Sequence, residues 1–274
     1  MKVLIAADME GITGVVDGNQ TNPSHAEYNR FRRLMTGDVN AAIRGAFDAG
    51  ADEVVVSDGH WFNLNILIEE LDPRARLNTG SPRPFSMVEG VQHGVDGVLF
   101  VGYHARVGTQ DAILDHTWSS GRVDGVWLNG EIVGEIGLNA AVCGHYGAPV
   151  LLISGDQTAC AEATDLLGDI ETAVVKRATG RNSAECLPPE VTGRLIRDAA
   201  ERALRRLKSG AAPAPRRLTP PITVAVEFIR SEMADAAAIL PGAERIGGKR
   251  VAFTAADMPT AYRAFRSLVG LASI

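Results

Sequence analysis

The chain opens with Met1-Lys2-Val3-Leu4-Ile5-Ala6-Ala7-Asp8-Met9-Glu10-Gly11, a short apolar run that ends at two carboxylates. A continuous apolar run, without polar alternation, is typical of a strand that is buried on both faces of a parallel sheet. The apolar part is too short for a signal peptide. The stretch therefore predicts the first core strand of an α/β fold.

Similar runs recur at residues 54–56, 98–101 and 150–153, with amphipathic stretches between them. Residues 36–49 carry apolar side chains on one helical face, and residues 190–209 place an apolar stripe opposite a face rich in Arg and Lys. We interpret that basic face as solvated. The alternation of strand and helix patterns predicts a mostly parallel sheet with flanking helices.

A proline-rich stretch at residues 210–221 divides the chain, because proline removes backbone donors and disfavours regular structure before it. Strand patterns follow at residues 222–228 and 250–255, and a helix pattern covers residues 261–271. We therefore expect three parts: a metal-binding catalytic α/β portion (1–209), a linker (210–221) and a C-terminal βαβα-like portion (222–274). The last part either packs onto the first sheet or forms a domain of its own.

Composition excludes several functional classes. The 274 residues include 27 Lys+Arg and 33 Asp+Glu, a formal net charge of −6, which argues against nucleic acid as a partner. No apolar run approaches the roughly 18 residues that a membrane span requires. The 3 cysteines are too few for a disulfide framework or a Cys-rich zinc site. We expect a cytoplasmic protein.

Chemistry-bearing side chains follow directly after three of the apolar runs. Asp8 and Glu10 follow the first run, His60 follows the second in Ser57-Asp58-Gly59-His60, and His104 follows the third in Gly102-Tyr103-His104. Ligands of open α/β sheets bind beyond the carboxyl ends of the strands, so a parallel sheet brings these groups to one edge. Two carboxylates and two imidazoles suit zinc or a similar transition metal. A continuing strand would also place Asp8 and Glu10 on one face.

Each of these residues also has a structural interpretation. A lone aspartate after a strand is more often a helix cap or a turn residue, and a lone histidine is more often a partly buried one with its hydrogen bonds satisfied. It is the shared position of Asp8, Glu10, His60 and His104 after apolar runs that favours a metal site.

Two downstream features are open to more than one interpretation. His116 lies twelve residues after His104, and it is either a catalytic imidazole that folds back over the site or a surface loop residue. Glu131 and Glu135 stand at helical i, i+4 spacing, where either can be a ligand or a general base, or both can be solvated acids at a helix start. Spacing alone does not choose between them.

Five motifs in order resemble the zinc-dependent D-aminopeptidases associated with bacterial dipeptide-transport operons. These are Asp8-Met9-Glu10-Gly11-Ile12-Thr13-Gly14, Asp58-Gly59-His60, Pro84-Phe85-Ser86-Met87-Val88-Glu89-Gly90, Gly102-Tyr103-His104-Ala105 and Val133-Gly134-Glu135-Ile136-Gly137-Leu138-Asn139-Ala140. The likeness runs almost from end to end. It departs from the family at Trp61-Phe62 and around His116, so we expect these positions to affect side-chain preference.

The resemblance implies a metal-dependent aminopeptidase that removes D-residues from short peptides through a metal-activated water in a two-zinc site. It places the metal ligands on Asp8, Glu10, His60, His104 and Glu135, with Asp8 as the bridge, and the catalytic histidine on His116. It thereby favours Glu135 over Glu131. It also implies a homodecamer of two stacked pentamers.

Three competing functions would each leave a different signal in the sequence. Another two-metal hydrolase, such as a phosphoesterase, would use the same ligand types, although the chain lacks the phosphate-loop pattern G-x-x-x-x-G-K-[ST]. A non-catalytic peptide-binding protein would be expected to carry an export signal and a degenerate ligand set. A dinucleotide-binding enzyme is disfavoured because no G-x-G-x-x-G follows the first strand.

Overall fold

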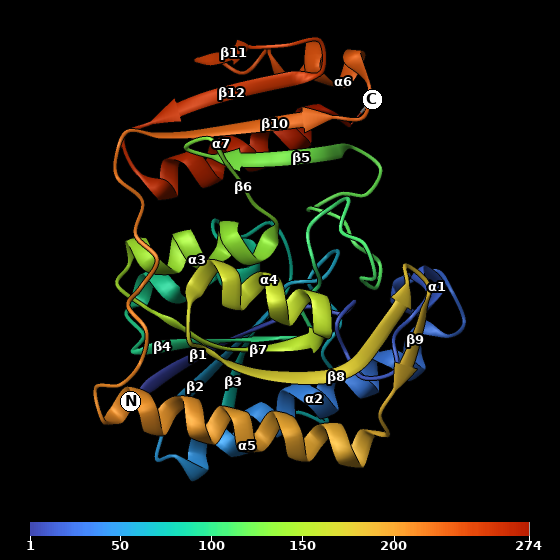
Figure 1. The fold of residues 1–274 in the computed structure, drawn as a ribbon, viewed down its shortest axis with the longest axis vertical. Helices are drawn as coiled ribbons and strands as arrows, with labels where there is room; N and C mark the ends of the chain where they lie inside the picture. Colours follow the sequence, from blue (N-terminus) through green and yellow to red (C-terminus); the bar gives the residue numbers. More distant parts are fainter. Residues whose placement is uncertain (274) are drawn as a thin grey trace.

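A seven-stranded sheet in the order β3-β2-β1-β4-β7-β8-β9 forms the larger layer of the computed structural model, which describes residues 1–273 (Figure 1). Its strands are β1 (Lys2–Ala7), β2 (Glu53–Asp58), β3 (Ala75–Asn78), β4 (Gly97–Val101), β7 (Val150–Asp156), β8 (Glu171–Gly180) and β9 (Ser183–Cys186). All neighbouring strands are parallel except β8 and β9. The predicted mostly parallel sheet is confirmed, and the four predicted apolar strands lie within β1, β2, β4 and β7.

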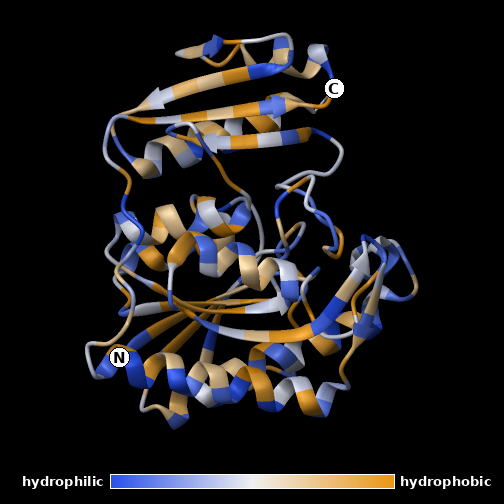
Figure 2. Ribbon diagram, viewed as in Figure 1, coloured by the Kyte–Doolittle hydropathy of each residue, from blue (hydrophilic) through white to orange (hydrophobic). Residues whose placement is uncertain are grey.

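Helices cover both faces of the central strands β1, β2, β4 and β7, which explains why these four strands are buried almost throughout. The helices are α1 (Gly18–Thr21), α2 (Tyr28–Asp48), α3 (Glu135–His145), α4 (Gln157–Leu167), α5 (Pro189–Lys208), α6 (Ser231–Ala237) and α7 (Met258–Leu271). Along β1, Val3 and Ile5 face the core that contains α2 and α5, whereas Leu4 and Ala6 face the core that contains α3 and α4. Figure 2 shows hydrophobic residues concentrated in these central strands.

Two helices were predicted with different accuracy. Helix α5 agrees with its predicted range to within one residue at each end. Helix α2 begins at Tyr28, eight residues before its predicted start at Thr36. Its buried residues Tyr28, Phe31 and Met35 extend the apolar stripe at helical spacing, a signal between the arginines that the prediction missed. None of the helices among the described residues is long and apolar enough to cross a bilayer.

A second, antiparallel sheet in the order β11-β12-β10-β5-β6 lies above helices α3, α4 and α7 (Figure 1). Its strands are β5 (Val123–Leu128), β6 (Glu131–Ile132), β10 (Ile222–Phe228), β11 (Ala243–Arg245) and β12 (Arg250–Ala255). Strand β10 pairs with both β12 and β5. The C-terminal portion thus builds this sheet together with two strands from the middle of the chain.

The proline-rich stretch at 210–221 contains no helix or strand, and it runs against α3. A Cβ atom placed on Gly144 would lie 1.8 Å from the carbonyl oxygen of Arg216, and the Arg216 guanidinium pairs with Glu131 at 2.6 Å. The stretch therefore contacts α3 and β6 at Arg216.

Strands β2, β1 and β4 are adjacent and parallel, so the segments that follow them leave the same edge of the sheet. The segments after β1 and β4 run in direct contact: the Gly11 amide donates to the Gly102 carbonyl at 2.8 Å. A side chain on Gly11 would bring its Cβ to 2.0 Å from the Tyr103 carbonyl oxygen, and Gly102 has φ +74°. Glycine is therefore required at both positions for this close approach.

Candidate metal centre

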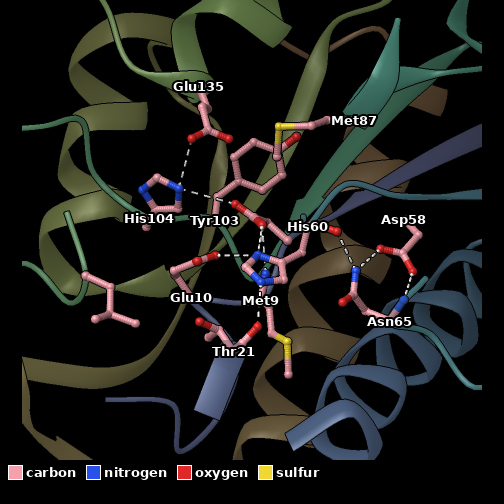
Figure 3. A network of polar contacts seen from close by, with 12 residues as sticks. Met9, Glu10, Thr21, Asp58, His60, Asn65, Met87, Tyr103, His104 and Glu135 are labelled. Carbon is pink, nitrogen blue, oxygen red and sulfur yellow. Dashed lines mark hydrogen bonds and ion pairs between the residues drawn. The ribbon is translucent and has the colours of Figure 1, made fainter. Parts of the chain in front are cut away.

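Six side chains meet at the carboxyl edge of the larger sheet: Asp8, Glu10, His60, His104, His116 and Glu135. Figure 3 labels Glu10, His60, His104 and Glu135 among them. Asp8 and Glu10 follow strand β1, His60 follows β2 and His104 follows β4. Glu135 is the first residue of α3, and His116 lies in the segment between β4 and β5. Five of the six side chains are buried, and His116 is partly exposed. The sequence pattern thus placed these residues together, although the paired strand geometry expected for Asp8 and Glu10 is wrong: β1 ends at Ala7, and both residues lie in the turn beyond it.

The first set of contacts joins His60 to the two carboxylates after β1. Its Nδ1 lies 3.4 Å from Asp8 Oδ1 and 3.1 Å from Glu10 Oε2. The other ring nitrogen, Nε2, lies 2.9 Å from the Thr21 carbonyl oxygen. Because a neutral imidazole carries one N–H, Nε2 is the donor, and the Nδ1 lone pair faces the carboxylates.

The second set of contacts is built on His104, whose Nε2 lies 3.3 Å from Asp8 Oδ2 and 3.2 Å from Glu135 Oε1. The ring of His116 stacks on that of His104 with centroids 4.1 Å apart, and its Nε2 lies 3.7 Å from Glu135 Oε1. Both rings are oriented through Nδ1, by the carbonyls of Ala105 at 2.9 Å and Leu114 at 2.8 Å. Metal-binding histidines are commonly oriented in this way by a backbone carbonyl on the far nitrogen.

The donor atoms of this cluster need a cation. Asp8 Oδ2, Glu10 Oε2 and His104 Nε2 are buried and have no hydrogen-bond partner. Buried polar atoms are rarely left unsatisfied, and lone pairs that face carboxylates repel unless a positive charge lies between them. Two overlapping groups, Asp8–Glu10–His104 and His104–His116–Glu135, each bring their donor atoms within 4.8 Å of one another. The residues present therefore fit metal ions.

Electrostatics in the cluster lead to the same requirement. Burial alone would raise the pKa of Asp8, but the neighbouring imidazoles of His104 and His60 outweigh it and hold that pKa well below its usual range. Burial would lower the pKa of His60, but Glu10 and Asp8 outweigh it and raise that pKa well above its usual value. The carboxylates thus stay ionised and favour a positive charge beside them, which protons on the imidazoles supply in the absence of metal and a bound metal ion would supply in their place.

The loop after β1 is held by a lysine that the sequence interpretation missed. Lys176 on β8 is 1% exposed, and its ammonium donates to the carbonyl oxygens of Glu10 at 2.6 Å, Ile12 at 2.9 Å and Val15 at 2.6 Å. These three bonds fix the backbone that carries Glu10. The available signal was a lysine in the otherwise apolar run Ala173-Val174-Val175-Lys176.

Two further residues support the ligands without joining them. Asp58, in the Asp58-Gly59-His60 motif, accepts hydrogen bonds from the backbone amides of Asn65 at 2.5 Å and Ile66 at 2.9 Å, and so closes the loop that carries His60 (Figure 3). Asp38 accepts from the backbone amide of Thr13 at 2.9 Å, and burial raises the pKa of Asp38 to about 6.

Glu131 and Glu135 occupy different elements, although their spacing is helical. Glu131 lies in the short strand β6, where it is exposed and pairs with Arg216. Glu135 begins α3, is 5% exposed, and its Oε1 accepts the Trp118 backbone amide at 2.7 Å. The two carboxylates therefore lie in different environments, Glu131 on the exposed strand β6 and Glu135 at the buried start of α3.

A cavity of about 820 Å³ opens over the cluster. Asp8, Glu10, His60, His116 and Glu135 line it on one side. Its remaining lining includes aromatic side chains and arginines: the exposed Trp61 and Phe62, the partly buried Trp118, and Arg122, Arg181 and Arg266. The candidate metal centre is therefore reached through a site large enough for a small peptide.

Carboxylates and imidazoles that converge in a cavity at the carboxyl edge of a parallel sheet define a metal-dependent hydrolase. The family model for peptidase M55, described as D-aminopeptidase, matches residues 1–267. The chain is 39% identical over 275 residues to a D-aminopeptidase of Bacillus subtilis (strain 168), a match that covers 99% of this chain and 98% of the relative. The chain belongs to the peptidase M55 family of D-aminopeptidases, and the resemblance found in the sequence is confirmed.

A solved structure gives the same result. The fold is similar to that of the zinc-dependent D-aminopeptidase DppA from Bacillus subtilis, which is described as a self-compartmentalizing protease. The TM-score is 0.95 at 37% sequence identity, and the match covers 99% of this chain and 98% of the other.

Proposed function

We propose that this chain is a zinc-dependent aminopeptidase that removes N-terminal D-residues from short peptides at a two-zinc site. The observation that carries the proposal is the set of buried, unpartnered donor atoms on Asp8, Glu10 and His104. Family membership and the zinc dependence of the solved relative support the choice of metal and substrate.

In this proposal one zinc is held by Asp8, Glu10 and His60, and the other by Asp8, His104 and Glu135. Asp8 would contribute to both sites, since its Oδ1 faces His60 at 3.4 Å and its Oδ2 faces His104 at 3.3 Å. Zinc bound there supplies a polarised substrate carbonyl and a water of lowered pKa.

His116 is the proposed catalytic residue. Its ring is held against His104, and its Nδ1 is fixed by the Leu114 carbonyl, so Nε2 is the atom that remains free to act. From the cavity wall, Nε2 can hold the charge that develops on the substrate oxygen or pass a proton to the departing amine. The carboxylates and the His60 and His104 rings beside it are buried, which strengthens the charge interactions among them.

We also propose a homodecamer, which would enclose the sites. The self-compartmentalizing solved relative supports this assembly. Large apolar side chains that are exposed on one segment beside the cavity are consistent with subunit contacts, namely Trp61, Phe62, Leu64 and Ile68. Mass photometry should give a particle of ten chains, whereas a monomer at micromolar concentration would contradict the assembly.

The decisive experiment measures metal content and selectivity together. We expect two zinc ions per chain by elemental analysis and faster hydrolysis of D-alanyl-D-alanine than of L-alanyl-L-alanine. A chelator should abolish the activity and added zinc should restore it. Full activity in metal-free protein would overturn the metal assignment, and a preference for p-nitrophenyl phosphate would favour a phosphoesterase.

A further inference from the structure

The cavity over the metal centre is divided by charge. Its acidic lining residues are the three proposed ligands Asp8, Glu10 and Glu135. Its basic lining residues, apart from histidine, are Arg122, Arg181 and Arg266, which come from three different parts of the chain. A short peptide carries an ammonium at one end and a carboxylate at the other, so the division of charge is complementary to a peptide with two free ends.

Two of the three guanidinium groups are already engaged. Arg181 donates from Nε to Asp115 Oδ1 at 3.0 Å and from Nη2 to the Asp115 carbonyl at 3.3 Å. Arg266 donates from Nη1 to the Pro84 carbonyl at 3.0 Å, and its guanidinium carbon lies 5.9 Å from the Trp118 ring centre. Both groups therefore act first as supports of the cavity wall.

Arg122 differs from both. Across residues 1–273 its side chain makes no hydrogen bond or ion pair, although it is half-buried. The nearest acidic residue in sequence, Asp124, pairs instead with Lys249 at 3.1 Å. The Arg122 backbone is nevertheless fixed, because its amide donates to the Ser119 carbonyl at 3.1 Å and its carbonyl accepts the Ile229 amide at 2.9 Å. A guanidinium on a fixed backbone, in a cavity and without a partner, is suited to binding an anion.

The separation between Arg122 and the metal centre is comparable to the length of a small peptide. Trp118 donates its backbone amide to Glu135 Oε1 at 2.7 Å, so the segment that leads to Arg122 starts at the metal centre. Four residues span at most about 14 Å, and the turn from Ser119 to Arg122 brings the ends of that turn within about 7 Å. An extended dipeptide or tripeptide covers about 7–10 Å.

We propose that Arg122 binds the C-terminal carboxylate of the substrate, and thereby restricts the enzyme to short peptides with a free C-terminus. This inference rests on the proposed function and names its substrate class more closely. The planar guanidinium donates two parallel hydrogen bonds to the carboxylate. The other end of the peptide then lies toward the carboxylates of Asp8, Glu10 and Glu135.

The test compares D-alanyl-D-alanine with its C-terminal amide, which has the same scissile bond and no terminal charge. Released D-alanine is measured for the wild type, Arg122→Gln and Arg122→Lys. We expect Arg122→Gln to reduce the ratio of kcat/KM for the free peptide to that for the amide by about tenfold or more, mostly through KM. Arg122→Lys should restore part of the ratio, because it keeps the charge but loses the bidentate geometry.

Arg194→Gln is the matched control, since Arg194 is exposed on α5 and pairs with Glu190. It should keep the wild-type ratio. Each ratio compares two substrates on the same protein sample. A misfolded fraction therefore lowers both kcat/KM values equally and leaves the ratio unchanged. Equal loss on both substrates in Arg122→Gln, or a wild type that does not distinguish the amide from the free peptide, would overturn the inference. Failure of the wild type to hydrolyse either substrate would instead overturn the proposed function.

Discussion

The two halves of the metal centre share Asp8 but are held in place differently. Asp8, Glu10 and His60 come from two adjacent parallel strands, and a lysine on the distant strand β8 fixes the loop that carries Glu10. His104 and Glu135 come from β4 and from the first turn of α3, and Glu135 is held by the Trp118 backbone amide. The first half therefore depends on a long-range contact between β8 and the loop, and the second on a helix start and the segment beside it.

The largest expected effect comes from His104, which faces both Asp8 and Glu135. His104→Ala should lose most bound metal and all measurable activity, because even substitutions beyond the direct ligands cost about 10–100-fold in metal affinity. Zinc content and peptide hydrolysis are the measurements. His93→Ala, at an exposed histidine in a short turn, is the control and should change neither. Full activity with undiminished zinc in His104→Ala would contradict the ligand assignment.

Glu135 tests the second half alone. Glu135→Ala should lose one zinc, keep the other and abolish turnover, whereas Glu131→Ala should be nearly silent because it removes only an exposed ion pair worth about 0–1 kcal/mol. Zinc stoichiometry separates the two variants. If Glu131→Ala were the severe substitution, the assignment of the helix-start glutamate as ligand would be wrong.

His116 separates catalysis from metal binding. His116→Ala should retain both zinc ions and lose about 10²–10⁴-fold in kcat, the usual contribution of a general acid or base. The measurement is kcat at saturating peptide with zinc content determined on the same sample. A variant that loses zinc in proportion to its activity would show that His116 serves the metal rather than the reaction.

A substitution of Lys176 tests how the Asp8–Glu10–His60 half of the metal centre is supported. Lys176→Met removes one donor from the Ile12 carbonyl, which keeps the Val15 amide, and leaves the carbonyls of Glu10 and Val15 without their lysine donor. At about 1–3 kcal/mol for each carbonyl left without a donor, the thermal midpoint and the zinc affinity of the Asp8–Glu10–His60 side should both fall. Lys249→Met, which removes only the ion pair to Asp124, is the matched control and should cost about 1 kcal/mol or less. Unchanged zinc affinity in Lys176→Met would show that the loop keeps its shape without the lysine.

Much of this arrangement could be predicted from local sequence. Apolar runs that end in Asp8, His60 and His104 predicted both the parallel sheet and the edge where the residues meet, because parallel strands end on the same side. Only the family resemblance favoured Glu135 over Glu131 as the metal ligand. Two residues four positions apart can lie on one helix, or one can lie in a strand and the other at the start of the next helix, so the spacing does not decide between them.

Local sequence patterns did not predict the contacts between residues far apart in the chain. Residues 123–128 pair with residues 222–228, almost 100 residues later in the chain, and neither segment carries a sequence signal that identifies the other as its partner. The same holds for Lys176, whose three acceptors lie more than 160 residues earlier in the chain. Arg122 stands out only once the cavity is seen, because an arginine in a loop has no pattern of its own.

The ammonium of Lys176 does for the loop after β1 what a bound sodium or potassium ion does in other proteins, with carbonyl oxygens gathered around a positive charge. Here the ion is covalently part of the chain, so dialysis cannot remove it. The loop should therefore keep its shape in buffers free of monovalent salt and after chelators have stripped the centre. Metal-depleted enzyme prepared in this way should regain activity on simple addition of zinc, without refolding.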